Sequence, residues 1–184
     1  MGGGLGVSYL ATDKPPSIEE YVKRITKALK QKIRGTHHKN IHLMLEPGRS
    51  VVATAGVTLY RVGIVKKIPG VRTYVSVDGG MADNPRPILY DAKYHAVVAN
   101  RMNDRPKDKY TVVGRYCESG DVLLKDITLP EPRVGDLLAV AATGAYNYSM
   151  SSNYNRVPRP AMVMVSHGKA KLIVKRVTSN KKLW

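Results

Sequence analysis

The sequence predicts an α/β segment followed by an antiparallel β domain, and three observations support this prediction. A helical pattern over residues 17–34 precedes a short apolar run at 41–45, which together are typical of an α/β unit. From residue 57 onward, short β-type runs alternate with Gly and Pro clusters. The 184 residues are 43% hydrophobic and 24% charged, so the chain can bury a core.

Residues 17–34 are expected to form an amphipathic helix. Ser17 and Glu20 have the spacing of a capping box, and Gly35 is a natural stop. The apolar side chains recur at helical spacing and form one stripe: Ile18, Tyr21, Val22, Ile25, Ala28, Leu29 and Ile33. The run at 41–45 predicts a strand covered on both faces, because nearly all of its residues are apolar.

The second part of the chain is expected to be mostly β. The predicted strands are 57–65, 72–77, 110–113, 137–141, 161–165 and 171–177, with short helices within 50–56 and 90–99. Because the pattern changes near residue 56, we expect two domains, 1–56 and 57–184.

The charge is strongly basic, with 30 Lys and Arg against 14 Asp and Glu, a net charge of +16. This charge makes a basic nucleic-acid-binding module one alternative. No zinc-finger spacing, aromatic RNA-binding strand or helix-turn-helix pattern accompanies the charge, so we expect no nucleic-acid partner.

The sequence also restricts the kinds of metal site and the cellular location that can be expected. The single cysteine, Cys117, excludes a disulfide framework and a multi-cysteine zinc site. His37, His38 and His42 have no neighbouring carboxylate at ligand spacing, so no metal is expected. No apolar run approaches the roughly 20 residues that span a bilayer, and the N-terminus lacks the order of a signal peptide. A cytoplasmic protein without membrane partners is expected.

Two glycine-containing motifs indicate an anion site. GGGLG at 2–6 would let backbone N–H groups approach a phosphate, although a flexible start is the alternative. EPGR at 46–49 follows the predicted strand, where α/β barrels place their sites. There Arg49 could bind phosphate or carboxylate and Glu46 could face a basic ring nitrogen, unless the two form a salt bridge in a turn.

Three later motifs are polar and rich in turn formers. DGGMADNPRP at 78–87 holds Arg86 between two prolines, which suits a bidentate grip on a carboxylate; a plain loop is the alternative. CESGD at 117–121 places Cys117 beside carboxylates, a setting for proton transfer, or leaves it inert and half-buried. The tyrosine-rich stretch from 144 predicts a site-lining loop in which Tyr146 offers a hydroxyl to phosphate, or a long surface loop.

Taken in order, these motifs resemble the diaminopimelate decarboxylase family of pyridoxal-phosphate (PLP) enzymes, in the alanine-racemase-like and ornithine-decarboxylase-like group. The matching motifs are GGGLG at 2–6, EPGR at 46–49, DGGMADNPRP at 78–87, CESGD at 117–121 and GAYNYSMSSNYNRVPRPA at 144–161. The resemblance implies the C-terminal remnant of a (β/α)8 PLP barrel, followed by an antiparallel Greek-key-like β-barrel or sandwich. It implies decarboxylation of meso-2,6-diaminopimelate to L-lysine, the last step of lysine biosynthesis.

The resemblance also implies roles for individual residues. The cofactor would be held by Gly3, Gly4, Pro47, Gly48, Arg49 and Tyr146, with Glu46 at its pyridine nitrogen. The substrate carboxylate that is not lost would be held by Arg49, Arg86 and Tyr90, with Tyr146 nearby. Glu118 would meet the distal ammonium, and Cys117 would deliver the proton that replaces CO2. In this family Cys117 and Glu118 would reach into the neighbouring subunit's site, so a homodimer is implied.

The family forms its Schiff base through a lysine near the start of a much longer chain, and no lysine here lies in that motif. The chain is therefore expected to be the C-terminal part of a decarboxylase and inactive alone. A missing N-terminal barrel fragment is a candidate partner. A related PLP decarboxylase acting on another basic amino acid stays open as a second alternative.

Overall fold

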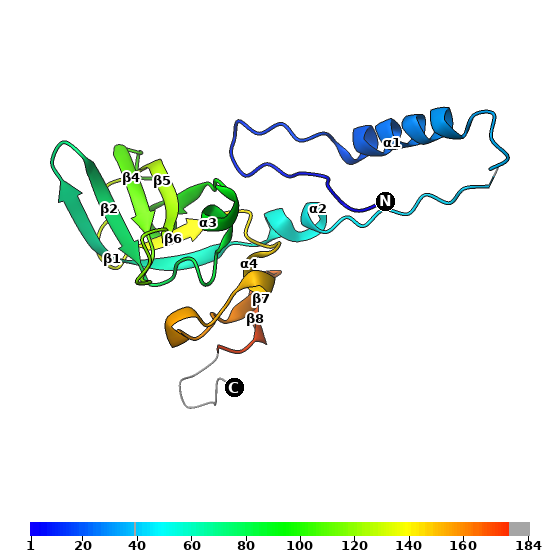
Figure 1. The fold of residues 1–184 in the computed structure, drawn as a ribbon. Helices are drawn as coiled ribbons and strands as arrows, with labels where there is room; N and C mark the ends of the chain where they lie inside the picture. The colour runs from blue at the N-terminus through cyan, green and yellow to red at the C-terminus, as the bar shows by residue number, and fades with distance from the viewer. Residues whose placement is uncertain (39, 177–184) are drawn as a thin grey trace.

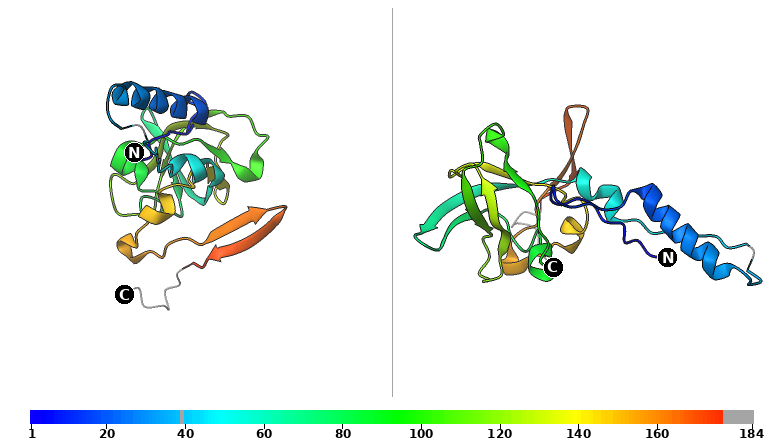
Figure 2. Two further views of the ribbon diagram at one scale, coloured as in Figure 1. Left: turned by 90° about the vertical axis from the view of Figure 1, so that its right-hand side faces the viewer. Right: turned by 90° about the horizontal axis from the view of Figure 1, so that it is seen from above.

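The computed structural model describes residues 1–38 and 40–176, and Figure 1 shows a six-stranded sheet wrapped into a barrel. The long helix α1 projects away from the barrel, and a two-stranded hairpin lies on another side (Figures 1 and 2). The helices are α1 (Ile18–Ile33), α2 (Arg49–Val52), α3 (Arg86–Tyr90) and α4 (Asn147–Met150). The strands are β1 (Thr58–Ile68), β2 (Arg72–Val77), β3 (Ala96–Val98), β4 (Asp108–Val113), β5 (Val122–Leu129), β6 (Leu137–Val140), β7 (Met162–Ser166) and β8 (Lys169–Val174).

Helix α1 forms where the sequence predicts it, because its signals are local. The Oγ atom of Ser17 accepts a hydrogen bond from the backbone N–H of Glu20 at 3.1 Å. The Glu20 carboxylate pairs with Arg24 one turn along. No residue of α1 is buried, so its apolar stripe is left without a covering surface among the described residues.

The prediction of a strand at 41–45 is wrong. This segment is extended but unpaired with any described strand, and Ile41 and Met44 are 43% and 77% exposed. A strand needs a neighbour to satisfy its backbone N–H and C=O groups. The apolar composition suits a buried strand, but the described part of the chain provides no neighbour.

The barrel sheet has the strand order β3-β6-β1-β2-β4-β5, and the two edge strands β3 and β5 lie in contact, so the barrel is nearly closed. The expected fold class is confirmed, but the sheet is mixed rather than fully antiparallel, because β2 and β4 pair in parallel. Strands β7 and β8 form a separate antiparallel hairpin.

The predicted strands match β1, β2, β4, β6, β7 and β8 with shifted ends, and the expected end of the last one at residue 177 lies outside the described residues. Two strands, β3 and β5, were not predicted from the sequence. Strand β3 has three residues and lies within the stretch 90–99 where a short helix was expected; residues 91–95 of that stretch are neither helix nor strand. Strand β5 is interrupted by Asp126, whose left-handed backbone (φ 52°) disturbs the alternation of apolar and polar side chains.

The barrel interior is filled by aliphatic and tyrosine side chains from all six strands. The largest fully buried hydrophobic residues are Val62, Val75, Val98, Val112, Leu129, Leu138 and Val140. Burial of these β-branched and leucine side chains drives closure of the sheet.

The directions of the strands determine at which of the two ends of the barrel each connecting loop lies. Strands β2, β4 and β6 run toward one end, and β1, β3 and β5 begin there. The connections of this end contain residues 46–57, 78–95, 114–121 and 141–161, and we call it the motif end. The far end carries the connections 69–71, 99–107 and 130–136.

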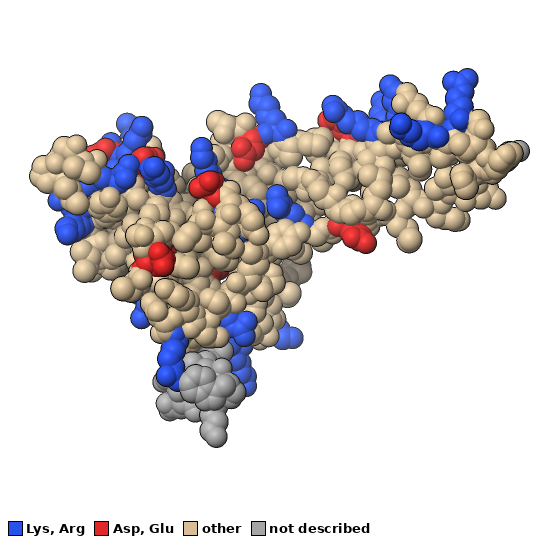
Figure 3. Space-filling model, in the orientation of Figure 1, with Lys and Arg blue, Asp and Glu red and all other residues tan. Residues whose placement is uncertain are grey.

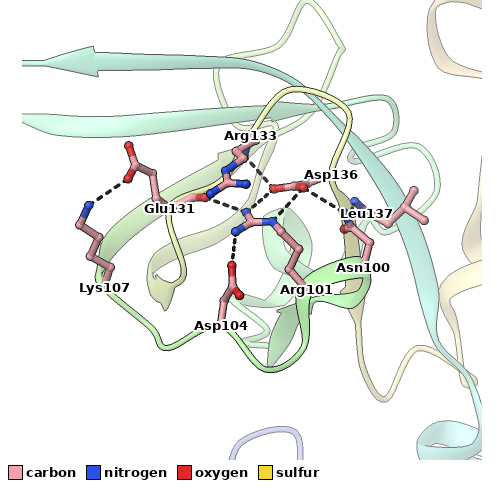
Figure 4. A network of polar contacts seen from close by, with 8 residues as sticks. All are labelled: Asn100, Arg101, Asp104, Lys107, Glu131, Arg133, Asp136 and Leu137. Carbon is pink, nitrogen blue, oxygen red and sulfur yellow. Dashed lines mark hydrogen bonds and ion pairs between the residues drawn. The ribbon is translucent and has the colours of Figure 1, made fainter.

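A polar cluster ties the far end together (Figure 4). The Nη2 atom of Arg101 lies 2.6 Å from Oδ2 of Asp136 and donates to the carbonyl of Glu131 at 2.8 Å, while Nη1 pairs with Asp104. The hydrogen bond from Arg101 holds the pKa of Asp136 at about 2. The cluster joins the 99–107 connection to the 130–136 connection, so it fixes the barrel remote from the motifs.

Candidate functional site

Residues from three distant motifs meet at the motif end. A Cβ atom on Gly3 would lie 2.4 Å from the carbonyl oxygen of Glu46, so only glycine fits there. A Cβ atom on Gly48 would lie 2.9 Å from the hydroxyl of Tyr146. The guanidinium carbon of Arg49 lies 5.6 Å from the centre of the Tyr146 ring. The structure therefore brings together the GGGLG, EPGR and GAY motifs.

This cluster suits an anionic group. The Nε atom of Arg49 is buried and has no hydrogen-bond partner among the described residues. Tyr146 is 43% exposed and lies beside the arginine. A guanidinium, a phenol and close-approaching glycine backbone are the donors that a phosphate requires. The exposed carboxylate of Glu46 is available nearby for a protonated ring nitrogen, while Gly4 and Pro47 are exposed neighbours in the chain.

Backbone docking positions Tyr146. The N–H groups of Thr143 and Gly144 donate to the carbonyls of Gly56 at 3.0 Å and Ala53 at 2.9 Å. A Cβ atom on Gly144 would lie 1.9 Å from the carbonyl oxygen of Val52. This close approach joins the loop after β6 to the short helical segment that begins with Arg49.

Arg86 is held by two tyrosines. It is 6% exposed, and its Nη1 atom donates to the hydroxyls of Tyr9 at 2.9 Å and Tyr94 at 2.8 Å. Burial lowers the pKa of Arg86, but the two tyrosine oxygens outweigh burial and raise it overall. No carboxylate among the described residues pairs with Arg86, so it is a fixed cation that can accept an anion.

An amide pair connects the Arg86 loop to the tyrosine loop. Asn84 and Asn147 are both buried, and their side-chain amides approach to 2.7 Å. Asn147 also lies within hydrogen-bonding reach of the Tyr94 hydroxyl. Arg86 and Arg49 are therefore linked through Tyr94, Asn147 and the adjacent Tyr146, in one continuous set of contacts.

Cys117, Glu118 and Tyr90 lie apart from this cluster. All three side chains are exposed. Cys117 and Glu118 are on the turn between β4 and β5, and Ile88 of α3 packs against Gly120 of that turn. No hydrogen bond, ion pair or ring contact among the described residues joins these side chains to Arg49 or Tyr146.

Two carboxyl groups lie in the loops at the motif end: Asp121 is buried and Asp83 is partly buried. The hydroxyl of Tyr60 donates to Oδ2 of Asp83 at 2.6 Å, and the N–H of Gly80 donates to Oδ1 at 2.9 Å. Burial raises the pKa of Asp83 to about 6. Burial also raises the pKa of Asp121, and that of Tyr116 to about 12. These groups support the loops and were not assigned roles from the sequence.

The sequence does not indicate Tyr9 and Tyr94 as partners of Arg86. Each is a single tyrosine in a loop, and no local spacing relates Tyr9 to a residue 77 positions away. Asp121 lies within the CESGD motif, which singled out the segment without indicating that its carboxylate is buried.

In the view of Figure 3, Lys and Arg side chains lie over α1 and also over the barrel. Basic residues of this helix line its solvent face: Lys23, Arg24, Lys27, Lys30 and Lys32. No helix in the described part of the chain is long and apolar enough to cross a membrane.

Comparison with known proteins agrees with the arrangement of the motifs. Residues 17–144 match the family model described as pyridoxal-dependent decarboxylase, C-terminal sheet domain. Over 97% of its length, the chain is 52% identical to diaminopimelate decarboxylases from Synechocystis sp. and Bacillus subtilis. It spans 38% and 40% of the length of these two relatives.

A solved structure gives the same result. The crystal structure of diaminopimelate decarboxylase from M. jannaschii in co-complex with L-lysine matches with a TM-score of 0.87 and 38% identity, over 96% of this chain and 40% of that one. The family match, the relatives and the converging glycine, arginine and tyrosine motifs lead to one conclusion: the chain belongs to the pyridoxal-dependent decarboxylases.

Proposed function

We propose that this chain is the C-terminal part of a diaminopimelate decarboxylase, which converts meso-2,6-diaminopimelate to L-lysine as the last step of lysine biosynthesis. The observation that carries the proposal is Arg86, a buried guanidinium held by Tyr9 and Tyr94 without a carboxylate partner among the described residues. The substrate has a second amino-acid end whose carboxylate must be recognised, and ornithine lacks that group. A fixed, unpaired guanidinium supplies such recognition.

The cofactor site is assigned to the cluster around Arg49. Gly3, Gly4, Pro47, Gly48 and Arg49, together with Tyr146, would hold the phosphate of PLP, and Glu46 would face its pyridine nitrogen. When bound, PLP supplies an electron sink for the negative charge left by loss of CO2. The Nε atom of Arg49, which has no hydrogen-bond partner among the described residues, and the exposed Tyr146 beside it support this assignment.

Substrate binding divides between two groups of residues. Arg49, Arg86 and Tyr90, with Tyr146 beside them, would hold the carboxylate that remains. Glu118 would receive the distal ammonium, and Cys117 would deliver the replacing proton. The outward exposure of Cys117 and Glu118 supports a homodimer in which each turn serves the partner's site.

The remainder of the cofactor site would come from an N-terminal barrel portion that carries the Schiff-base lysine. Residues 1–56 would complete that barrel, and 57–184 would form the β domain. The unburied apolar stripe of α1 and the unpaired segment 41–45 support a missing neighbour, since each exposes apolar side chains. We expect a cytoplasmic enzyme that is inactive as the 184-residue chain alone.

The test combines this chain with an N-terminal barrel portion from a related decarboxylase and measures lysine release from diaminopimelate. Arg86→Ala should lower turnover at least about 100-fold, because truncating one partner of a buried charge contact costs several kcal/mol. PLP absorbance should change little. Arg61→Ala, which removes an exposed arginine from β1, is the matched control and should retain activity.

Equal loss of PLP binding and turnover in Arg86→Ala would contradict the assigned role of Arg86. Failure of the unsubstituted mixture to release lysine, with both parts folded and PLP bound, would contradict the proposed function itself.

A further inference from the structure

One buried carboxylate joins the two loops that carry the proposed substrate residues. Asp121 is 4% exposed. Its Oδ1 atom accepts a hydrogen bond from the N–H of Met81 at 2.7 Å, and its Oδ2 atom accepts one from the N–H of Tyr116 at 2.9 Å. Each oxygen therefore serves a different loop.

The surroundings of Asp121 leave room for the carboxylate alone. A Cβ atom on Gly80 would lie 2.5 Å from Oδ1, and a Cβ atom on Gly114 would lie 2.1 Å from Oδ2. Because Gly80 and Gly114 lack side chains, the backbones of both loops can approach the Asp121 carboxylate closely. A buried charge held by two backbone N–H groups is costly to disturb, because either N–H would be left unsatisfied.

The parallel pairing of β2 and β4 makes this junction possible. Parallel neighbours end at the same edge, so the loop after Val77 and the loop after Val113 leave the sheet side by side. The first loop leads to Arg86, and the second leads directly from Tyr116 to Cys117 and Glu118.

We propose that Asp121 is a positioning residue that sets the Cys117–Glu118 turn relative to the Arg86 loop. The inference rests on the proposed function. Arg86 would act in the site of its own chain, and Cys117 and Glu118 in the site of the partner. Asp121 therefore holds two substrate-binding elements of neighbouring sites at a fixed separation, and a displacement of one loop is transmitted to the other.

The test exploits the single cysteine of the chain. A nitroxide attached to Cys117 reports the mobility of the turn by electron paramagnetic resonance, without any enzyme activity. Asp121→Asn keeps the size of the side chain but offers one acceptor oxygen for two N–H donors. We expect a clearly more mobile nitroxide spectrum in this variant of the full chain.

Arg101→Met is the control, because it loosens the far end of the barrel without touching either loop. Its nitroxide spectrum should match that of the unsubstituted chain under conditions where both remain folded. An immobile nitroxide in Asp121→Asn, or equal mobility in the control, would overturn the proposal.

If Asp121→Asn does not fold, amide hydrogen exchange of the unsubstituted chain tests the proposal without a variant. The amides of Met81 and Tyr116 should exchange far more slowly than that of exposed Ser119. Exchange of all three at the same rate would reject the junction.

Kinetics of the assembled enzyme separate this inference from the function. Asp121→Asn should lower kcat about 10–100-fold while PLP loading persists, because misplacing a reacting group by about 1 Å has an effect of this size. Unchanged kcat with a mobile turn would refute the positioning role. An assembled unsubstituted enzyme without activity would refute the proposed function, whereas the spectra and hydrogen exchange would still decide whether Asp121 fixes the turn.

Discussion

Replacing Asp83 by asparagine should remove one component of the pH dependence of stability. Burial raises the pKa of Asp83 from 3.8 to about 6 in the folded chain. Between these pH values the folded protein keeps a proton that the unfolded chain releases, so stability falls as the pH rises through this range. The pKa difference corresponds to roughly 3 kcal/mol, at about 1.4 kcal/mol for each unit.

The asparagine amide should keep both contacts, since its oxygen can accept from Gly80 and its NH2 group can donate to the Tyr60 hydroxyl. Urea unfolding followed by circular dichroism, at pH 4 and at pH 7.5, gives the free energy of unfolding for each variant. As the pH rises from 4 to 7.5, the free energy of unfolding of the unsubstituted chain should fall by up to roughly 3 kcal/mol more than that of Asp83→Asn.

Asp91→Asn, at an exposed position just after α3, is the matched control and should leave the pH dependence unchanged. Parallel stability curves for Asp83→Asn and the unsubstituted chain between pH 4 and 7.5 would refute the reasoning.

Two further predictions concern the far end of the barrel and the docking of the Tyr146 loop. Arg101→Met should destabilise the chain in urea unfolding at pH 7, because the buried carboxylate of Asp136 would lose its ion-pair partner. This loss should shrink as the pH falls from 3.8 to about 2, where Asp136 itself becomes protonated; a pH-independent loss would contradict the ion pair. Gly144→Ala should weaken PLP binding by the assembled enzyme at least about 10-fold, because a Cβ atom would lie 1.9 Å from the Val52 carbonyl and displace Tyr146. Gly70→Ala, in an open turn at the far end, is its control, and equal PLP affinity in the two variants would contradict the docking.

The parts of the fold that the sequence predicts well depend on neighbours in the chain. Helix α1 begins beside Ser17 and ends before Gly35 because capping and apolar periodicity act within a few residues. The segment 41–45 has the composition of a buried strand, but strand formation requires a partner that no local pattern supplies. Strand β5 escaped prediction because Asp126 interrupts its alternation.

The same distinction applies to the candidate site. Motif order indicated Arg49, Tyr146 and Arg86 as candidate site residues, and the structure places Arg49 and Tyr146 in contact. The partners of Arg86 could not be predicted, because Tyr9 and Tyr94 reach it only through the closed fold. The buried state of Asp121 likewise depends on a parallel strand pair in a domain expected to be antiparallel.

The separation of the barrel into two ends has a consequence for how such a protein can diversify. The proposed substrate-binding residues lie in connections at one rim, whereas the Arg101–Asp136 ion pair that secures the opposite rim has no hydrogen bond or ion pair with them among the described residues. Substitutions at the motif end can therefore change the proposed substrate recognition, while the ion pair at the far end continues to stabilise the fold. A lineage could explore new ligands and new growth temperatures through largely independent sets of substitutions.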